Sequence, residues 1–306
     1  MIRIGLIGTQ SMHAWAFAQT CNVPDENGIT QIPEAKVEIV YGVDDTQAHI
    51  EQTLKKGNIL MQASTIDELY QNSDAVMILQ RIGSEHTPYA CDLIRRGIPV
   101  FIDKPVCSTM EDIDLLTEAA ALSTATVCGG SGLKYTKQIV MLKAKIEAGE
   151  YGDIRSGTIV YSADTESPYD GMFFYLPHAV EMMLELFGYD PVSVKTTVLA
   201  HNNFTVCVKY ETALVNLVMN GSREPAVIIN GDVNDIIRIN AEDIFLENMR
   251  HFVNQIEKKD MDCDIEKLTM HVRVILAAKE SADTGMEAFV AQSVPYKRPK
   301  GKGAVL

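Results

Sequence analysis

The sequence predicts an α/β protein. We expect a doubly wound parallel sheet in the N-terminal part, followed by an α+β domain with a large, mostly antiparallel sheet. In the first third of the chain, short continuous apolar runs alternate with amphipathic stretches, a pattern typical of strands that helices bury on both faces. After about residue 128, long β-rich runs follow one another with few helices between them. The length of 306 residues fits two domains, which we expect at 1–127 and 128–306.

The first domain is expected to repeat a strand–helix unit. Each expected strand is a short run rich in Val, Ile and Leu, and each expected helix has apolar residues at helical spacing. The expected strands cover 2–7, 36–43, 75–79 and 100–102. The expected helices cover 11–20, 46–55, 87–96 and 110–122, and Ser108 or Thr109 is a suitable N-cap for the last of them.

The second domain is expected to contain more strand than helix. Its expected strands cover 156–162, 192–199, 204–210 and 213–219. Its expected helices cover 136–148, 178–187, 243–258 and 265–282. Strands that cluster in this way indicate an antiparallel or mixed sheet. We expect the glycine-rich stretch 129–132 to act as a hinge between the two domains.

Charge and composition limit the kinds of partner. The chain has 41 acidic and 27 basic residues, and its net charge of -14 disfavours nucleic acid and anionic membranes while leaving a local basic pocket possible. No run approaches the roughly 18 apolar residues that span a bilayer, and no signal-peptide pattern is present. The six cysteines are widely spaced, which indicates reduced thiols. We therefore expect a cytoplasmic protein whose partners include neither nucleic acid nor a membrane.

The first strand runs into a turn where a dinucleotide-binding fold holds its phosphates. The required pattern G-x-G-x-x-G is reduced here to Gly8, with Gln10 and His13 at the other two glycine positions. The N-terminus of the next helix still offers free N–H groups and partial positive charge to an anion. From this motif alone, a dinucleotide site and a ligand-free strand–helix turn both stay open.

Acidic residues end the second expected strand, where a carboxylate would bind both hydroxyls of the adenine ribose. Asp44 is the candidate for this role, and Asp45 follows it directly. A carboxylate at this position repels a 2′-phosphate, so it favours NAD over NADP. The alternative is that Asp45 merely begins the next helix.

Two further residues could act on a substrate. Lys104 follows the strand at 100–102, and ligands bind at the carboxyl end of such strands. His178 begins an apolar helix directly after Pro177, where a neutral imidazole could accept a proton from a hydroxyl group. The alternatives are an exposed lysine at a strand end and a histidine with a structural hydrogen bond.

Together, the N-terminal strand–turn–helix, the step Asp103-Lys104-Pro105 and the helix with His178 resemble the Gfo/Idh/MocA oxidoreductase family. The similar stretches extend over almost the whole chain, at 4–8, 37–44, 74–78 leading to His86, 97–105, 149–154 and 278–285. The resemblance implies an NAD(P)-binding Rossmann domain followed by a sheet domain, with a sugar, a polyol or a related hydroxy compound as substrate.

The resemblance also implies the residues of the site. Lys104 takes the position of the family's lysine that contacts substrate and nicotinamide, and His178 matches its proton-transferring histidine. The implied cofactor-binding residues are Gly8, Thr9, Gln10, Ser11, His13, Asp44, Arg81, His86, Asp103 and Lys104. The implied substrate-binding residues are Lys104, Tyr175 and His178. A homodimer or homotetramer formed through the second-domain sheet is implied as well.

The chain departs from the family's pattern at two positions besides the glycines. Phe174 stands where family members often have an aspartate four residues before the histidine, so Tyr175 or Glu181 is the candidate for assisting His178. Ile82 replaces a proline that often follows the third strand, and Arg81 beside it is a candidate for binding an acidic group of the substrate.

The sequence thus predicts an NAD-dependent oxidoreductase. His178 would remove a hydroxyl proton while hydride leaves the same carbon, and Lys104 would stabilise the oxygen. Two alternatives stay open: a catalytically silent binding or regulatory protein, and non-redox chemistry in which bound NAD is recycled. The acidic stretch 260–264 lacks the glycine and the terminal glutamate of a calcium loop, and no zinc spacing occurs, so no metal is expected.

Overall fold

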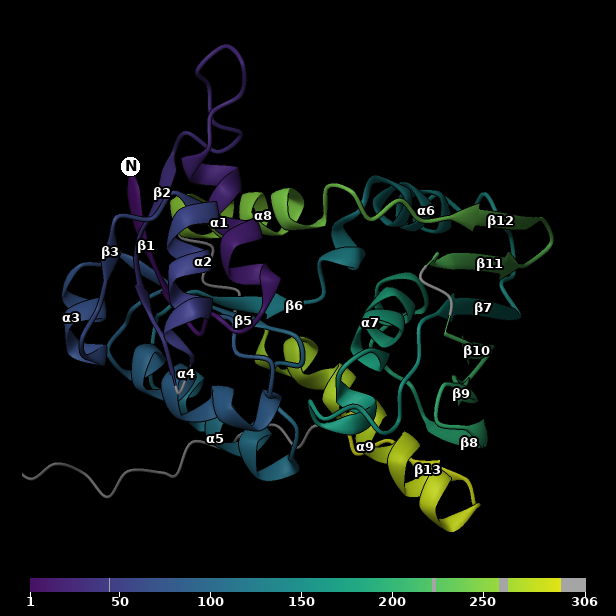
Figure 1. Cartoon of the computed structure of the whole chain (residues 1–306). Coiled ribbons are helices and arrows are strands. Elements are labelled where there is room, and N and C mark those ends of the chain that lie inside the picture. Colours follow the sequence, from purple (N-terminus) through teal and green to yellow (C-terminus); the bar gives the residue numbers. More distant parts are fainter. Residues whose placement is uncertain (44, 222–223, 259–263, 293–306) are drawn as a thin grey trace, which may run out of the picture.

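The structure, a computed structural model, describes residues 1–43, 45–221, 224–258 and 264–292. Its two sheets lie side by side with helices between and around them (Figure 1). This arrangement confirms the predicted fold class, a doubly wound parallel sheet followed by a domain with a mostly antiparallel sheet.

The first sheet is parallel throughout, in the order β3-β2-β1-β4-β5-β6. Its strands are β1 (Ile2–Ile7), β2 (Ala35–Tyr41), β3 (Met61–Gln62), β4 (Ala75–Ile78), β5 (Val100–Asp103) and β6 (Val127–Gly130). Its helices are α1 (Met12–Asn22), α2 (Gln47–Gly57), α3 (Ile66–Gln71), α4 (His86–Arg95) and α5 (Met110–Ala121). The strand order reverses beside β1, so β1 and β4 open the crevice in which such sheets bind ligands.

Threonine N-caps begin three of the helices among the described residues. Thr46, Thr65 and Thr109 each accept a hydrogen bond from a backbone N–H in the first turn of α2, α3 and α5. Such a cap satisfies a donor that has no partner within the helix. The sequence pattern does not predict β3, α3 or β6, because elements this short carry too few residues for a periodic pattern.

The second sheet has the order β12-β11-β7-β10-β9-β8-β13 and is antiparallel except where β7 pairs with β10. Its strands are β7 (Ser156–Tyr161), β8 (Ser193–Ala200), β9 (Asn203–Lys209), β10 (Leu214–Met219), β11 (Ala226–Asn230), β12 (Asn234–Arg238) and β13 (Ala288–Phe289). The helices of this half are α6 (Lys137–Glu147), α7 (Leu176–Phe187), α8 (Ile244–Lys258) and α9 (Ile265–Thr284). Of these, α7 packs on β7 and β10, and α9 packs on β8.

Helix α8 returns from the second half of the chain to the first domain. It lies beside α1 (Figure 1), and its side chains Met249 and Phe252 are fully buried with Phe17 and Phe101 of the first domain. Burying a phenylalanine contributes roughly 1.5–3 kcal/mol. This contact therefore ties the second half of the chain to the helix that follows the dinucleotide turn.

The glycine-rich stretch 129–132 is not a free hinge. Gly129 and Gly130 lie in β6, which hydrogen-bonds to β5, so the expected domain boundary between 127 and 128 falls inside a strand of the first sheet. Gly130 has a φ of +84°, and a Cβ there would meet the carboxylate of Glu181 in α7. Close packing accounts for these glycines, and we propose that the first domain extends through Gly130.

Candidate active site

Lys104 lies at the carboxyl end of β5 and faces the loop before α7. Its Nζ donates to the Phe174 carbonyl oxygen at 3.3 Å and lies 4.4 Å from the centre of the Phe174 ring. The residue is only 6 % exposed. Burial lowers the pKa of Lys104, and the charge of Arg81 adds to this effect, whereas Asp103 opposes it.

Asp103 forms a pair with His13 of α1. Asp103 Oδ2 lies 2.6 Å from His13 Nδ1, and the His13 ring meets the edge of Phe245 with the ring centres 5.0 Å apart. Burial would raise the pKa of Asp103, but the interactions with His13 and then Lys104 outweigh it and lower the pKa. His13, at the third glycine position of the dinucleotide motif, thus links the start of α1 to the strand end that carries Lys104.

His178 lies in the first turn of α7 and meets Ser131, which follows β6. The distance from His178 Nδ1 to Ser131 Oγ is 2.6 Å, and the edge of the His178 ring meets Tyr161 with the ring centres 5.2 Å apart. Burial lowers the pKa of His178 well below its ordinary value, and the charges of Lys104 and His13 lower it further. His178 is therefore a neutral imidazole at neutral pH.

A buried ion pair holds Ser131 in place. Glu181 Oε1 accepts from the Ser131 backbone N–H at 2.8 Å, and Glu181 Oε2 accepts from Lys134 Nζ at 2.7 Å. His271 Nδ1 lies 3.9 Å from the same carboxylate. We propose that Glu181 assists His178 only through Ser131, because its own oxygens bind these other groups.

An aromatic wall faces Lys104 from the loop before α7. We use this name for Tyr169, Phe174 and Tyr175, whose neighbouring ring centres are 5.0 Å and 4.7 Å apart. The Arg81 guanidinium lies 4.6 Å from the centre of the Tyr169 ring, a cation–π contact. Arg81 is thus held against the second domain, beside Lys104.

The turn after β1 combines a glycine with positive φ and a capped helix start. Gly8 has a φ of +89°, and a Cβ there would lie 2.9 Å from the backbone nitrogen of Gln80. Ser11 caps α1 by accepting from the His13 N–H. Gln10 is half-buried and lies between these two residues.

A carboxylate does lie at this turn, but it is that of Asp45. Its Oδ2 accepts from the backbone N–H of Thr9 at 2.7 Å and from the Thr9 hydroxyl at 2.8 Å. Among the described residues, nothing hydrogen-bonds the buried Oδ1 of Asp45 or the buried Oε1 of Gln80. Two buried acceptors without a partner beside a phosphate turn fit the hydroxyl and amide groups of a dinucleotide. The predicted ribose ligand Asp44 lies outside the described residues.

His86 lies near the end of β5, close enough to Asp103 and Lys104 for their charges to act on its pKa. It is fully buried, and its Nε2 lies 2.9 Å from the Gln80 carbonyl oxygen. We therefore propose that His86 supports the segment after β4 and does not contact a cofactor. Sequence reasoning missed Ser131 and Gln80, and the only signal for them was that each follows a strand of a parallel sheet.

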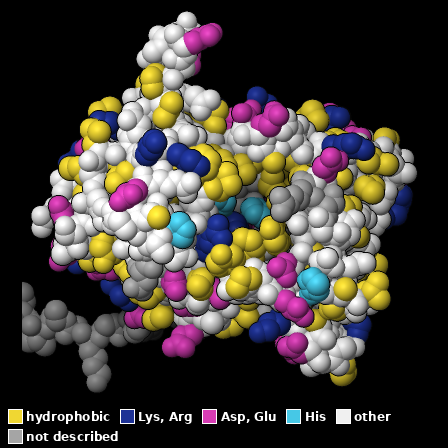
Figure 2. All heavy atoms as spheres, in the orientation of Figure 1, with side chains coloured by type: hydrophobic (Ala, Val, Ile, Leu, Met, Phe, Trp, Pro, Cys, Tyr) yellow, Lys and Arg dark blue, Asp and Glu magenta, His cyan; other side chains and the backbone are white. Residues whose placement is uncertain are grey.

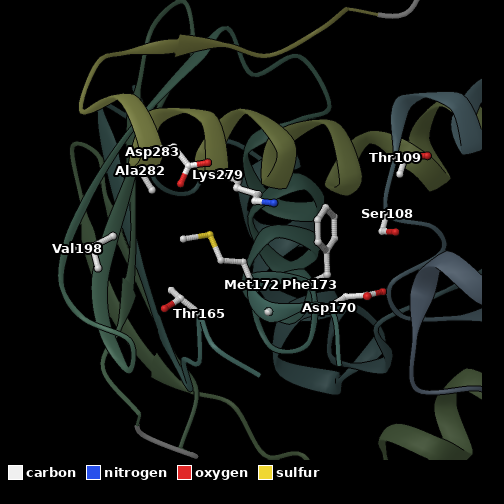
Figure 3. Close-up of a pocket in the computed structure, with 11 residues that line it drawn as sticks. Ser108, Thr109, Thr165, Asp170, Met172, Phe173, Val198, Lys279, Ala282 and Asp283 are labelled. Atoms are coloured by element: carbon white, nitrogen blue, oxygen red, sulfur yellow. The ribbon is translucent and has the colours of Figure 1, made fainter. Parts of the chain in front are cut away.

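The space-filling view has a hollow between the two domains, in which basic and histidine side chains gather among hydrophobic ones (Figure 2). A separate cavity of about 660 Å³ is lined by Met172 and Phe173 and, from α9, by Lys279 and Asp283 (Figure 3). Its lining includes neither Lys104 nor His178. Phe173 therefore faces this cavity, whereas its neighbour Phe174 contacts Lys104.

The described part of the chain contains no cluster of His, Cys, Asp and Glu side chains arranged to hold a metal ion. None of its helices combines the length and the hydrophobicity that crossing a bilayer requires.

Comparison with known proteins identifies the fold of both domains. The family model described as "Oxidoreductase family, NAD-binding Rossmann fold" (GFO_IDH_MocA) matches residues 2–130. Among solved structures, scyllo-inositol dehydrogenase from Lactobacillus casei with bound NAD(H) and scyllo-inositol has a TM-score of 0.79 at 18% identity, over 95% of this chain and 99% of that one. Myo-inositol dehydrogenase from Lactobacillus casei, in complex with NAD(H) and myo-inositol, has a TM-score of 0.80 at 15% identity, over 98% and 99%. Among curated proteins, none matches this sequence.

Proposed function

Since this chain belongs to the Gfo/Idh/MocA family of oxidoreductases, by the match over residues 2–130 and by its two-domain fold, we propose that it is an NAD-dependent oxidoreductase. The proposed reaction interconverts a hydroxyl and a keto group on a small polar substrate, a sugar, a polyol or a derivative. The inositol dehydrogenases of the same fold support this substrate class.

One observation carries the proposal. Lys104 follows β5 and reaches the loop before α7, and His13 of α1 pairs with Asp103 at the end of β5. Both lie close enough to His178 of α7 to lower its pKa. A neutral base, a lysine and a turn suited to a dinucleotide therefore share one space. This is the set of groups required to remove a proton from a hydroxyl oxygen and a hydride from the carbon that carries it.

The cofactor would lie at the turn after β1. Gly8, Thr9, Gln10, Ser11 and Asp45 would hold it, and when bound it supplies a nicotinamide that takes up or returns a hydride. The unpaired Oδ1 of Asp45 favours a ribose hydroxyl over a 2′-phosphate, because two anionic groups repel each other. NAD is therefore the proposed form.

His178 is the proposed base. We assign its Nδ1 proton to the hydrogen bond with Ser131 Oγ, which leaves the lone pair of Nε2 for a substrate hydroxyl. Ser131 holds this tautomer and is in turn held by Glu181. The proposed role of Lys104 is to donate to the substrate oxygen, in place of the bond that it makes to the Phe174 carbonyl. Tyr175 lies at the same wall as a further substrate contact.

Two measurements test the function. Calorimetric titration with NAD and with NADP should give binding of NAD in the micromolar range and weaker binding of NADP. NAD reduction is then screened with inositols and sugars, using wild type, Lys104→Ala and the exposed control Lys55→Ala. We expect Lys104→Ala to lose turnover and to keep most of its NAD affinity. Normal turnover by Lys104→Ala would refute the mechanism, and no binding of either nucleotide would refute the function.

A ligand-binding protein without turnover is the second candidate. The observation that favours it is that the Lys104 ammonium group already contacts the ring and the carbonyl oxygen of Phe174, so these contacts compete with a substrate oxygen. Phe174→Asp separates the two candidates, since a carboxylate there would restore the family's usual pattern. Turnover that appears only in Phe174→Asp would support the silent protein, whereas turnover in wild type would exclude it.

We further propose that two or four copies associate through the second sheet. Helices α7 and α9 pack on this sheet, and on β9, β10 and β11 the alternate residues include the half-buried Cys207, Val218 and Ile228. Apolar side chains on an uncovered sheet face favour pairing with a second sheet. Light scattering coupled to gel filtration measures the assembly, and a monomer would contradict this proposal.

A further inference from the structure

Arg81 is a half-buried cation without an acidic partner. It follows β4, and across the ranges that the structure describes no carboxylate lies within ion-pair distance of it. The chain has 41 acidic residues for 27 basic ones, so an arginine that lacks a carboxylate is unexpected. Removing a guanidinium from water without a counter-charge is unfavourable, and positions that tolerate this cost are often binding sites.

The aromatic wall joins Arg81 to the proposed catalytic lysine. Arg81 lies over Tyr169, the Tyr169 ring is tilted at 35° to Phe174, and Lys104 Nζ lies over Phe174. The charge of Arg81 is among the causes that lower the pKa of Lys104, so the two cationic groups lie near each other. Arg81 therefore lies at the substrate end of the site, near the residues proposed to act on the hydroxyl.

The geometry of Arg81 suits an oxyacid. A guanidinium that lies over an aromatic face uses its own face for that contact, so the N–H donors at its edge stay available for a planar, bidentate partner. Its single permanent charge matches the single charge of a carboxylate better than the two charges of a phosphate monoester. The aromatic wall offers flat apolar faces on which the C–H face of a sugar ring can pack.

A contact between Arg81 and the cofactor phosphates explains these observations less well. Those phosphates belong at the turn after Gly8, where the N-terminus of α1 supplies the N–H donors. Arg81 instead contacts Tyr169 of the second domain, and Ser84 close to it donates its N–H to Asp170 of the same loop. The segment after β4 thus faces the substrate domain.

Resting on the function proposed above, we propose that the substrate is a sugar acid or polyol acid. Its carboxylate binds Arg81, its ring packs on the aromatic wall, and its reacting hydroxyl reaches His178 and Lys104. This assigns Arg81 as the residue that selects an acidic substrate over the neutral sugars and inositols.

Binding to matched sugars tests this inference. The full-length protein, with and without NADH, is titrated calorimetrically with D-glucuronate against D-glucose and with D-galacturonate against D-galactose. Each pair differs only in a carboxylate in place of a hydroxymethyl group. We expect at least one uronate to bind about tenfold or more tightly than its parent sugar, since a charge-assisted bidentate pair is lost with the carboxylate.

Variants locate the source of the preference. In Arg81→Gln the ratio of the two affinities should fall to about one, and in Arg81→Lys it should be intermediate, because lysine keeps the charge but not the planar fork. The matched control is Arg95→Gln, which removes the same charge from the exposed end of α4. It should keep the wild-type ratio. D-glucose 6-phosphate is the phosphate probe and should bind no more tightly than the uronates.

The outcomes separate this inference from the proposed function. A ratio near one in wild type, a ratio that persists in Arg81→Gln, or tighter binding of the phosphate would overturn the inference even if NAD binds and neutral polyols reduce it. An Arg81-dependent preference in a protein that binds no NAD would support the inference while refuting the proposed function.

Discussion

The buried pair of Lys134 and Glu181 allows a quantitative test of how the site is held. Their side chains are 9% and 5% exposed, and the N–O distance is 2.7 Å. Burial would lower the pKa of Lys134, but Glu181 raises it well above its ordinary value, so the lysine stays charged. Lys134→Met therefore leaves a buried carboxylate whose nearest cation is lost.

The expected magnitude follows from the burial. Removing one partner of a buried ion pair costs about 3–5 kcal/mol. An unfolding entropy of roughly 2.1 cal/mol/K per residue over 306 residues converts this loss to a decrease of about 5–8 °C in Tm. Glu181→Gln should cost a similar amount, because the Lys134 ammonium then keeps only the Gly129 carbonyl as a full acceptor. The double variant removes both charges, so its loss of unfolding free energy should be smaller than the sum of the two single losses by about 2 kcal/mol or more.

Thermal and urea unfolding followed by circular dichroism measure these changes. The matched control is Lys143→Met, which breaks a pair to Glu185 with the same 2.7 Å distance but with a lysine that is 43% exposed. It should cost less than about 1 kcal/mol. The reasoning fails if Lys134→Met lowers Tm no more than Lys143→Met does, or if the double variant equals the sum of the two single ones.

Three further predictions can be checked with the purified protein. Asp45→Asn should weaken NAD binding by about ten- to a hundredfold in a calorimetric titration, because a charged acceptor for a ribose hydroxyl is lost; an unchanged affinity would contradict this assignment. Burial lowers the folded pKa of His86 and of His271 below the unfolded value of 6.5, so the unfolded state binds more protons at acidic pH. The free energy of unfolding should therefore fall below pH 6.5 by up to about 1.4 kcal/mol per pH unit for each histidine, and stability that is constant between pH 7 and 5 would refute this. Phe174→Ala should raise the pKa of Lys104 in an NMR titration by admitting water, and an unchanged value would show that Phe174 does not desolvate the lysine.

The sequence by itself predicted most elements that have a strong periodic pattern. Two examples are the strand Ile2–Ile7 and helix α7, each of which can be recognised from its own residues. A strand that is buried on both faces is apolar throughout, and a helix that is buried on one face has apolar residues at helical spacing. Lys104 and His178 became candidates from their places at a strand end and a helix start, and the family resemblance supplied their roles, which stay predictions. The short strand β6 and its two glycines were misjudged, since their role depends on neighbours from β5 and α7.

The tertiary structure alone decided how these residues are partnered. Asp103 and His13 are 90 residues apart, Lys104 and Phe174 are 70 apart, and Ser131 and His178 are 47 apart. A local pattern reports which face of an element is buried, but it carries no information on which distant side chain will meet that face. The pKa of each group depends on those partners and on the water they exclude, because both set the cost of a charge. The chemistry of the site is therefore a property of the folded contacts, whereas the architecture that creates them can be read along the chain.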